Sequence, residues 1–405
     1  MGKLTCAIVA FAVILFAVAV FIFMPISQFP EIKGEYGVGQ RFFHWVDKDR
    51  KELDTKDLEH PYREIVAYVF YPAKKDKYSK RIPYDLDAAK STMENLGRVS
   101  NLPSWLFGGI RFIKTHAQWN APLAKNKDSY PVIIFSHGGG PMIQHYTWLL
   151  ENLASHGFVV VAINHPYVAS VVRFPDNRVV KSIMTRARKI FKDRKSYEKW
   201  KFRQIETNAQ DVTFAINKME KLVASGDSFW SRVDLKKVGK LGQSFGGAVT
   251  MRATRKDRRI KCGVNMDERL APEDIDKPFD TPFLFLLAGK SHQWFNPKKL
   301  EEVFRLARMN GTNIYTVMFK NLNHGIFSDS PLHYNTTLFT RLLSMFIDPR
   351  LGVPVKESVA YIVDIIPQYL IDFFNKHLKN KQSNFFPKQK GEIVFEKDVN
   401  EAQAF

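Results

Sequence analysis

At positions 242–246 the chain reads Gly242-Gln243-Ser244-Phe245-Gly246, directly after the apolar run at residues 238–241. A glycine two positions before and after a serine lets a strand turn sharply into a helix, which exposes the serine hydroxyl in a strained turn. Residues 247–253 are small or helix-tolerant and can continue as that helix. Because the pattern also occurs by chance, its meaning depends on the surrounding segments. In this setting it predicts a nucleophile elbow, with Ser244 as the nucleophile.

Strand-like and helix-like segments alternate around this motif. The candidate strands are residues 65–71, 131–135, 158–163, 238–241, 261–266, 282–288 and 313–319. Residues 146–155 predict a helix between two of them, and apolar side chains spaced three and four apart predict another over 205–223. This alternation predicts a doubly wound, mostly parallel α/β sheet with helices on both faces. No repeat or Pro/Gly-rich linker divides residues 31–380, so we expect one domain there.

The composition restricts the classes of partner. The 405 residues are 45% hydrophobic, which is enough for a full core. The net charge of +19 favours anionic partners, either nucleic acid or acidic lipid headgroups. No zinc-finger, RRM or helix-turn-helix signature is present, so we expect no nucleic-acid partner. With Cys6 and Cys262 as its cysteines, the chain has no disulfide framework.

The N-terminal residues 6–24 form an apolar run without charge or proline. As a helix this run would be about 28 Å long, close to the thickness of the hydrocarbon layer of a bilayer. Lys3 on its short N-terminal side places the remainder of the chain in an extracellular, periplasmic or lumenal compartment. Residues 1–30 are therefore predicted to be a signal anchor with one transmembrane helix. Ala17 and Ala19 also fit a cleaved signal peptide, which would make the protein secreted.

A serine nucleophile needs a histidine base and an acid that orients it, and α/β-hydrolases place these in the order Ser, acid, His. His324 follows the last strong strand, where this fold carries its base, and His292 is the alternative. His333 and His377 are expected to be surface or structural residues.

The sequence indicates the carboxylate that orients the histidine less directly. The loop at residues 289–293, where this fold commonly carries it, contains no carboxylate. Asp267 directly follows the preceding strand, so we predict it to be the acid. The weaker candidates are Glu268, Asp274, Asp276 and Asp280.

Two backbone N–H groups are predicted to form the oxyanion hole. The first is that of Phe245, directly after the nucleophile. The second comes from His137-Gly138-Gly139-Gly140, the HGGG pattern of lipases and esterases, in which glycines let the backbone approach a substrate closely. We assign it to Gly139. Neither a metal ion nor a cofactor is expected.

Several blocks of the chain resemble the platelet-activating factor acetylhydrolase family, the type II plasma and intracellular enzymes of the α/β-hydrolase superfamily. The blocks are residues 119–123, 130–138, 153–160 and 242–247, and the resemblance covers roughly residues 35–380. It implies calcium-independent, serine-dependent hydrolysis of the sn-2 acyl ester of phospholipids with short or oxidised chains. It also implies Ser244, Asp267 and His324 as a triad, with Phe245 and Gly139 as the oxyanion hole.

The chain departs from that family pattern at two positions beside the site. Gly139 stands in place of a bulkier apolar residue, and Gln243 stands where the elbow commonly has histidine. Other acyl preferences therefore stay open, and a membrane-anchored general carboxylesterase, lipase or polyester hydrolase is an alternative. An alternative of another class is a catalytically silent lipid-binding protein.

Two segments are candidates for contact with a membrane surface. Residues 102–113 are densely apolar and suit either the core or a lipid interface. Residues 181–203, within a predicted basic insertion at 173–204, hold ten Lys or Arg against two acids. That composition is typical of a solvated helix face or of a segment that binds anionic lipid. Residues 381–405 are expected to form an extended tail, and nothing in the sequence defines the oligomeric state.

Overall fold

The computed structural model describes most of residues 28–382. The described residues are 28–55, 57–76, 80–125, 127, 129–270, 279–291, 298, 301–303, 305, 314–334, 355–382 and 393–396, with 8, 9, 11, 12, 14, 15 and 18.

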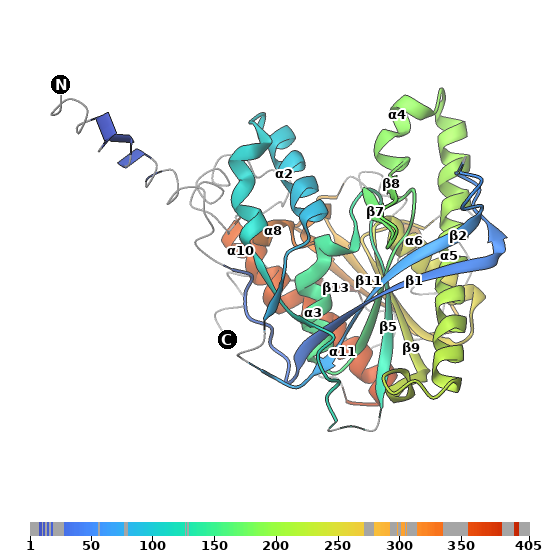
Figure 1. The fold of residues 1–405 in the computed structure, drawn as a ribbon. Coiled ribbons are helices and arrows are strands. Elements are labelled where there is room, and N and C mark those ends of the chain that lie inside the picture. Colours follow the sequence, from blue (N-terminus) through green and yellow to red (C-terminus); the bar gives the residue numbers. More distant parts are fainter. Residues whose placement is uncertain are drawn as a thin grey trace.

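One large mixed sheet forms the centre of the molecule (Figure 1). In the part of the chain described, its strand order is β13-β12-β11-β10-β9-β5-β6-β2-β1-β4-β3. The strands are β1 (Gly37–Lys51), β2 (Tyr62–Ala73), β3 (Arg81–Pro83), β4 (Lys114–Trp119), β5 (Tyr130–Ser136), β6 (Val159–Asn164), β9 (Val233–Gln243), β10 (Ile260–Met266), β11 (Phe283–Ala288), β12 (Ile314–Phe319) and β13 (Ile393–Glu396). A separate hairpin pairs β7 (Val171–Arg173) with β8 (Val179–Lys181).

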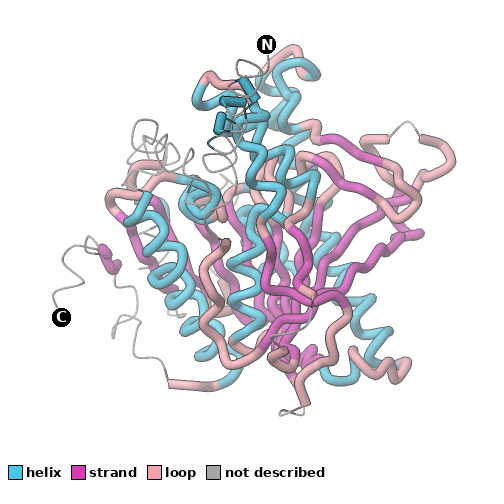
Figure 2. Tube along the Cα trace, turned by 60° about the vertical axis from the view of Figure 1, so that its left-hand side comes forward, coloured by secondary structure: helices cyan, strands magenta, loops and turns pink. Residues whose placement is uncertain are grey.

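Helices cover both faces of this sheet, as Figures 1 and 2 show. In the part of the chain that the structure describes, the α-helices are α2 (Leu86–Ser100), α3 (Thr147–Ser155), α4 (Ala187–Ile190), α5 (Arg194–Ala224), α6 (Phe245–Lys256), α8 (Ser330–Tyr334), α10 (Val355–Ala360) and α11 (Ile366–Lys379). Helices α3 and α11 pack on one face and α5 and α6 on the other. Successive side chains of β5 alternate between the two cores, Ile133 with the first and Ile134 with the second.

Each predicted strand run falls in a strand of the sheet, six of them in its parallel part and residues 65–71 in the antiparallel β2. Along the sheet, the strands from β6 to β13 run parallel, and β5, β6, β11 and β12 are buried along their whole length, which favours continuous apolar residues. The other strands of the antiparallel end, β1, β3 and β4, were not predicted. There β1 pairs antiparallel with β2, and β1 contains Gln40, Arg41 and Asp47, so it gives no apolar run.

The predicted helix at residues 6–24 lies almost wholly outside the described residues. Among the residues described, no helix has both the length and the apolar character needed to cross a bilayer. The transmembrane helix therefore stays a prediction from the sequence. The apolar segment 102–113 contains the 3₁₀ helix η1 (Ser104–Phe112), and the basic insertion contains β8, α4 and the first turns of α5.

Candidate active site

Ser244 occupies a strained turn between β9 and α6. Its backbone dihedrals are φ 51° and ψ −123°, a conformation that side-chain-bearing residues rarely adopt. The flanking glycines are required by space, because a Cβ on Gly242 would lie 1.9 Å from the carbonyl oxygen of Gly246. A Cβ on Gly246 would lie 2.1 Å from the carbonyl oxygen of Ser136. The sequence thus places Ser244 at the carboxyl edge of the sheet, where the parallel strands end.

Asp267 and His324 meet at this same edge. Asp267 follows β10 and is fully buried, and its Oδ1 accepts a hydrogen bond of 2.9 Å from the N–H of Ala288. Its Oδ2 lies 2.6 Å from Nδ1 of His324, which begins the 3₁₀ helix η7 (His324–Phe327) after β12. The carboxylate therefore holds the imidazole with its Nδ1 proton directed at Asp267.

The other candidate residues are placed differently. His292, Asp274 and Asp276 lie outside the described residues. Asp280 is exposed, and Glu268 is buried near His324 without being its hydrogen-bond partner in the described contacts. The remaining two histidines are the buried His333, 3.2 Å from the Tyr84 hydroxyl, and the partly buried His377.

Gln243 contacts the second nitrogen of the imidazole. Tyr146 accepts a hydrogen bond from the N–H of Gly138 and donates one of 2.8 Å to Oε1 of Gln243. This fixes the orientation of the amide, so that its Nε2 donates to Nε2 of His324 at 3.2 Å. Among the described contacts, the amide of Gln243 is the group on this nitrogen. Sequence reasoning noticed Gln243 only as a departure at the elbow.

The environment of His324 raises the pKa of its imidazole. Burial by itself lowers that pKa, but the hydrogen bond and the negative charge of Asp267, with the charge of Glu268, outweigh burial. The pKa therefore lies above the ordinary value of about 6.5.

Two backbone N–H groups beside Ser244 are available. In the HGGG loop, Gly138 donates to Tyr146, and Gly140 donates to a backbone carbonyl at 3.1 Å. Within the described part of the chain, the N–H groups of Gly139 and Phe245 have no protein acceptor. The two residues are neighbours, because a Cβ on Gly139 would lie 3.5 Å from Cβ of Phe245. That Cβ would also lie 2.0 Å from Sδ of Met184, so Met184 covers the loop.

A second Ser–His–Asp arrangement lies beneath the loop. The hydroxyl of Ser136 contacts Nε2 of His165 at 2.8 Å, and Nδ1 of His165 contacts Asp211 at 2.9 Å. Arg63 pairs with Asp211 at 2.7 Å, and Lys240 donates to Ser136 at 2.9 Å. These side chains are 0–1% exposed, so no substrate reaches them. They form a structural network that the sequence motifs did not indicate.

The charges in this network depend on burial. Burial alone would raise the pKa of Asp211, but the charge of Arg63 and the hydrogen bond from His165 outweigh it and hold that pKa far below its usual range. Burial also lowers the pKa of Lys240 well below its usual value. The network supports the end of β5 and hence the glycine loop that follows Ser136.

The parallel sheet, the elbow and the acid and histidine at its carboxyl edge define an α/β-hydrolase. The ferulic acid esterase from Streptomyces cinnamoneus has the same fold, with a TM-score of 0.63 and 23% identity over 91% of this chain and 96% of that one. The family model described as platelet-activating factor acetylhydrolase, isoform II, matches residues 21–394. The chain belongs to this family, as its sequence blocks predicted.

Individual relatives are distant in sequence. The platelet-activating factor acetylhydrolase of Cavia porcellus is 26% identical over 302 residues, which cover 70% of this chain and 66% of that protein. The protein of the same name from Canis lupus familiaris is 25% identical over 305 residues, covering 69% of this chain and 64% of that protein. The chain thus spans just under two thirds of the length of these relatives.

Proposed function

We propose that the protein hydrolyses the sn-2 acyl ester of phospholipids that carry a short or oxidised acyl chain. Ser244 is the nucleophile, His324 the general base and Asp267 the orienting acid. The observation that carries the proposal is the placement, at one edge of the sheet, of the strained Ser244 turn and of an imidazole whose Nδ1 is held by a buried carboxylate. Gln243, the residue before Ser244, contacts the second nitrogen of that imidazole. The family supplies the substrate class, since its named relatives are platelet-activating factor acetylhydrolases.

The steps of ester hydrolysis follow from the position of the proton on the imidazole of His324. With Nδ1–H bound to Asp267, the lone pair of His324 lies on Nε2, where it accepts from the Gln243 amide in this structure. For catalysis this lone pair exchanges the amide for the Ser244 hydroxyl and removes its proton. The oxyanion that forms on attack is stabilised by the N–H groups of Gly139 and Phe245. The imidazolium then protonates the departing lysophospholipid oxygen, and water hydrolyses the acyl-enzyme by the same relay.

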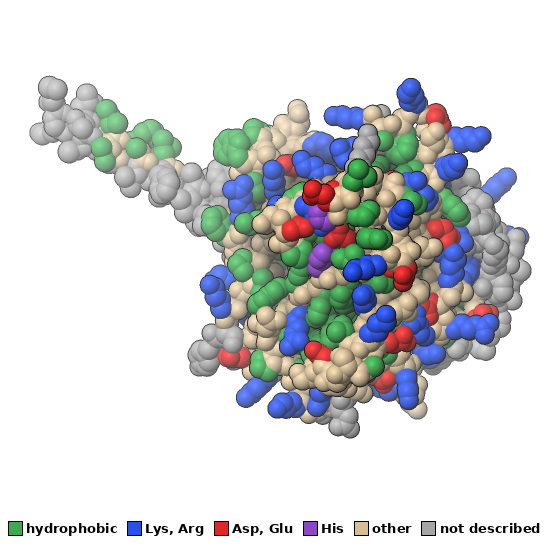
Figure 3. Space-filling model, turned by 45° about the vertical axis from the view of Figure 1, so that its right-hand side comes forward, with side chains coloured by type: hydrophobic (Ala, Val, Ile, Leu, Met, Phe, Trp, Pro, Cys, Tyr) green, Lys and Arg blue, Asp and Glu red, His purple; other side chains and the backbone are tan. Residues whose placement is uncertain are grey.

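The outer surface supports contact with lipid. Segment η1 buries Phe107 and Ile110 in the core, while Trp105 and Phe112 are 69% and 55% exposed. Figure 3 shows Lys and Arg spread over one face of the molecule, with acids among them. We propose a membrane surface, including anionic lipid, as the partner of these regions. Either an anchor at residues 1–30 or secretion after its cleavage agrees with a substrate outside the cytoplasm.

A substrate series tests the function. We expect an sn-2 acetyl phospholipid to be hydrolysed with a higher kcat/KM than its sn-2 palmitoyl counterpart, and excess EDTA to leave both rates unchanged. A preference for long chains, or rapid hydrolysis of p-nitrophenyl acetate without hydrolysis of any phospholipid, would indicate a general esterase or lipase. If no ester of either kind were hydrolysed, the result would favour the alternative of a catalytically silent lipid-binding protein. Loss of activity in EDTA would overturn calcium independence.

Gln243→Leu is expected to shift the pH dependence of the reaction. The Gln243 amide donates to neutral Nε2 and has no acceptor once this nitrogen is protonated, so it favours the neutral imidazole. Removing a partly buried hydrogen bond worth about 1 kcal/mol should move the acidic limb of kcat/KM by about 0.7 pH unit to higher pH. The measurement is a pH–rate profile with a soluble ester. Lower activity with an unmoved limb would show that Gln243 has a packing role only.

A further inference from the structure

A cleft of about 740 Å³ lies beside the glycine loop. Gly139 and Gly140 line it, and a Cβ on the preceding Gly138 would lie 3.4 Å from Cβ of Ser244. The cleft therefore shares its lining with the loop that lies next to Ser244.

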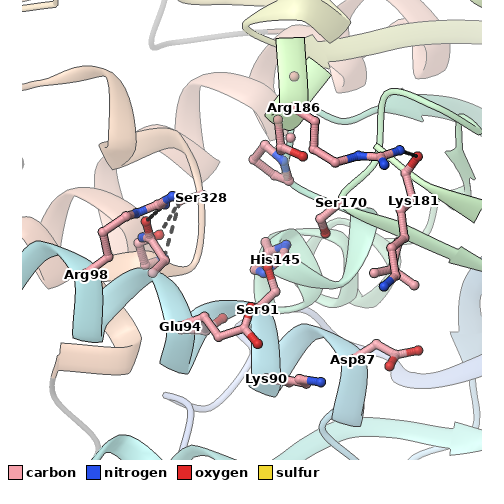
Figure 4. Close-up of a pocket in the computed structure, with 18 of the residues that line it drawn as sticks. Asp87, Lys90, Ser91, Glu94, Arg98, His145, Ser170, Lys181, Arg186 and Ser328 are labelled. Carbon is pink, nitrogen blue, oxygen red and sulfur yellow. Dashed lines mark hydrogen bonds between the residues drawn. The ribbon is translucent and has the colours of Figure 1, made fainter. Parts of the chain in front are cut away.

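Two elements form the facing walls of this cleft. Helix α2 supplies Lys90, Glu94 and Arg98, and the segment after β8 supplies Lys181 and Arg186 (Figure 4). The lining side chains among the described residues include five Lys or Arg and two acids. The walls of the cleft beside the glycine loop are thus strongly basic.

The ion pairs leave most of this positive charge unneutralised. Arg173 binds Asp87 through two hydrogen bonds of 3.0 and 3.1 Å, which neutralises one cation and one acid. Within the described residues, Lys90 and Lys181 have no carboxylate within 4.0 Å.

The two arginines that remain are held by uncharged groups. Arg186 donates to the backbone carbonyls of Lys181 and Ser182, and Arg98 donates to the side chain of Asn95. Among the described residues, neither is within 4.0 Å of a carboxylate. A guanidinium bound to neutral oxygens keeps its full charge and further N–H donors for an anion.

The cleft also holds a polar atom without a protein partner. Oγ of Ser170 is buried, lines the cleft between the two walls and forms no hydrogen bond in the described structure. A buried hydroxyl without a partner costs free energy unless a ligand or solvent oxygen satisfies it. Because Ser170 as a whole is only half-buried, a turn of its hydroxyl toward the cleft would let an anion held by the surrounding cations accept from it.

We propose that this cleft is the subsite for the phosphate of the phospholipid headgroup, with Lys90, Arg98, Lys181 and Arg186 as its cationic ligands. The proposal rests on the proposed function, because it assumes a glycerophospholipid whose ester lies at Ser244. Three bonds separate the sn-2 ester oxygen from the phosphodiester oxygen on C3 of glycerol, so the phosphate of a substrate bound at the glycine loop is within reach of the adjoining cleft. The subsite would make hydrolysis selective for phospholipids over neutral esters.

The test compares two substrates that share one ester. A 1-alkyl-2-acetyl-glycerophosphocholine and the corresponding 1-alkyl-2-acetyl-glycerol are used below their aggregation concentrations, so adsorption to a surface plays no part. The variants are Lys90→Gln/Arg98→Gln and Lys181→Gln/Arg186→Gln, each of which neutralises one wall of exposed residues. The matched control is Lys221→Gln/Lys236→Gln, two exposed lysines remote from the cleft lining.

Each wall variant is expected to lower kcat/KM for the phospholipid about tenfold or more, mainly through KM, since each lost charge-assisted contact is strong. Hydrolysis of the acetylglycerol should stay within about twofold, and the control should match the wild type on both substrates. The charge-preserving variant Lys181→Arg/Arg186→Lys should keep a kcat/KM for the phospholipid close to that of the wild type. Equal losses on both substrates, or no loss on the phospholipid, would overturn the subsite.

A competition experiment identifies the source of the phosphate. Inorganic phosphate is added during phospholipid hydrolysis by the wild type and by the wall variants. We expect weak competitive inhibition of the wild type that the variants lose. Inhibition by phosphate combined with unchanged phospholipid kinetics in the variants would mean that the cleft binds free phosphate and not the headgroup. A wild type inactive on both esters would refute the proposed function itself, a result distinct from failure of the subsite.

Discussion

Replacing Ser244 by alanine is expected to lower kcat for ester hydrolysis by about 10³–10⁶-fold, because the variant lacks the atom that forms the acyl-enzyme. Substrate binding should change little, since Ser244 is partly buried and its replacement leaves the two unpaired N–H groups in place. The measurement is steady-state hydrolysis of p-nitrophenyl acetate and of an acetyl phospholipid. The small residual rate would come from the oxyanion hole alone.

Two controls separate this result from misfolding. Ser231→Ala alters an exposed serine remote from the sheet edge and should retain wild-type kcat. A fluorophosphonate should label the wild type in the peptide that contains Ser244 and leave Ser136 unlabelled, because Ser136 is fully buried. Labelling of another serine, or Ser244→Ala with undiminished turnover, would contradict the assigned nucleophile.

The sequence predicted the site where local rules are strict. The elbow leaves no choice at Gly242 and Gly246, whose missing side chains would overlap with backbone atoms. Asp267 and His324 follow strands that are recognisable as apolar runs, and parallel strands bring their carboxyl ends to one edge. Those rules give the location of each residue. Its catalytic role is a proposal for the experiments to decide.

Other features depend on pairing between distant segments and left little local signal. Strand β1 is stabilised by its pairing with β2 along nearly its whole length, so polar residues such as Gln40 do not prevent it from forming. The contact of Gln243 with His324 requires Tyr146 to orient the amide, and that tyrosine lies 97 positions away in the chain. Segment η1 is both core and surface, a division that composition alone does not reveal.

Asp267→Asn is expected to reduce kcat/KM by about 10³–10⁴-fold at neutral pH. An asparagine amide can donate to Nδ1 of His324, which moves the imidazole proton to Nε2 and removes the lone pair that Ser244 needs. The substitution also removes the charge that raises the pKa of His324, so burial then lowers that pKa. The acidic limb of the remaining activity should therefore move to lower pH.

Stability gives an independent measure of the same pair. Since His324 has a raised pKa in the folded protein, its interaction with Asp267 adds stability that is fully present below the unfolded pKa of about 6.5 and is lost as pH rises through the folded pKa. Asp267→Asn should thus reduce the free energy of unfolding more at about pH 5.5 than at about pH 8. Asp280→Asn, an exposed change after the same strand, should alter neither activity nor this pH dependence. If Asp267→Asn lost activity while the pH profile and the pH dependence of stability stayed fixed, the loss would reflect a local distortion, and Asp267 would not be the acid that orients the base.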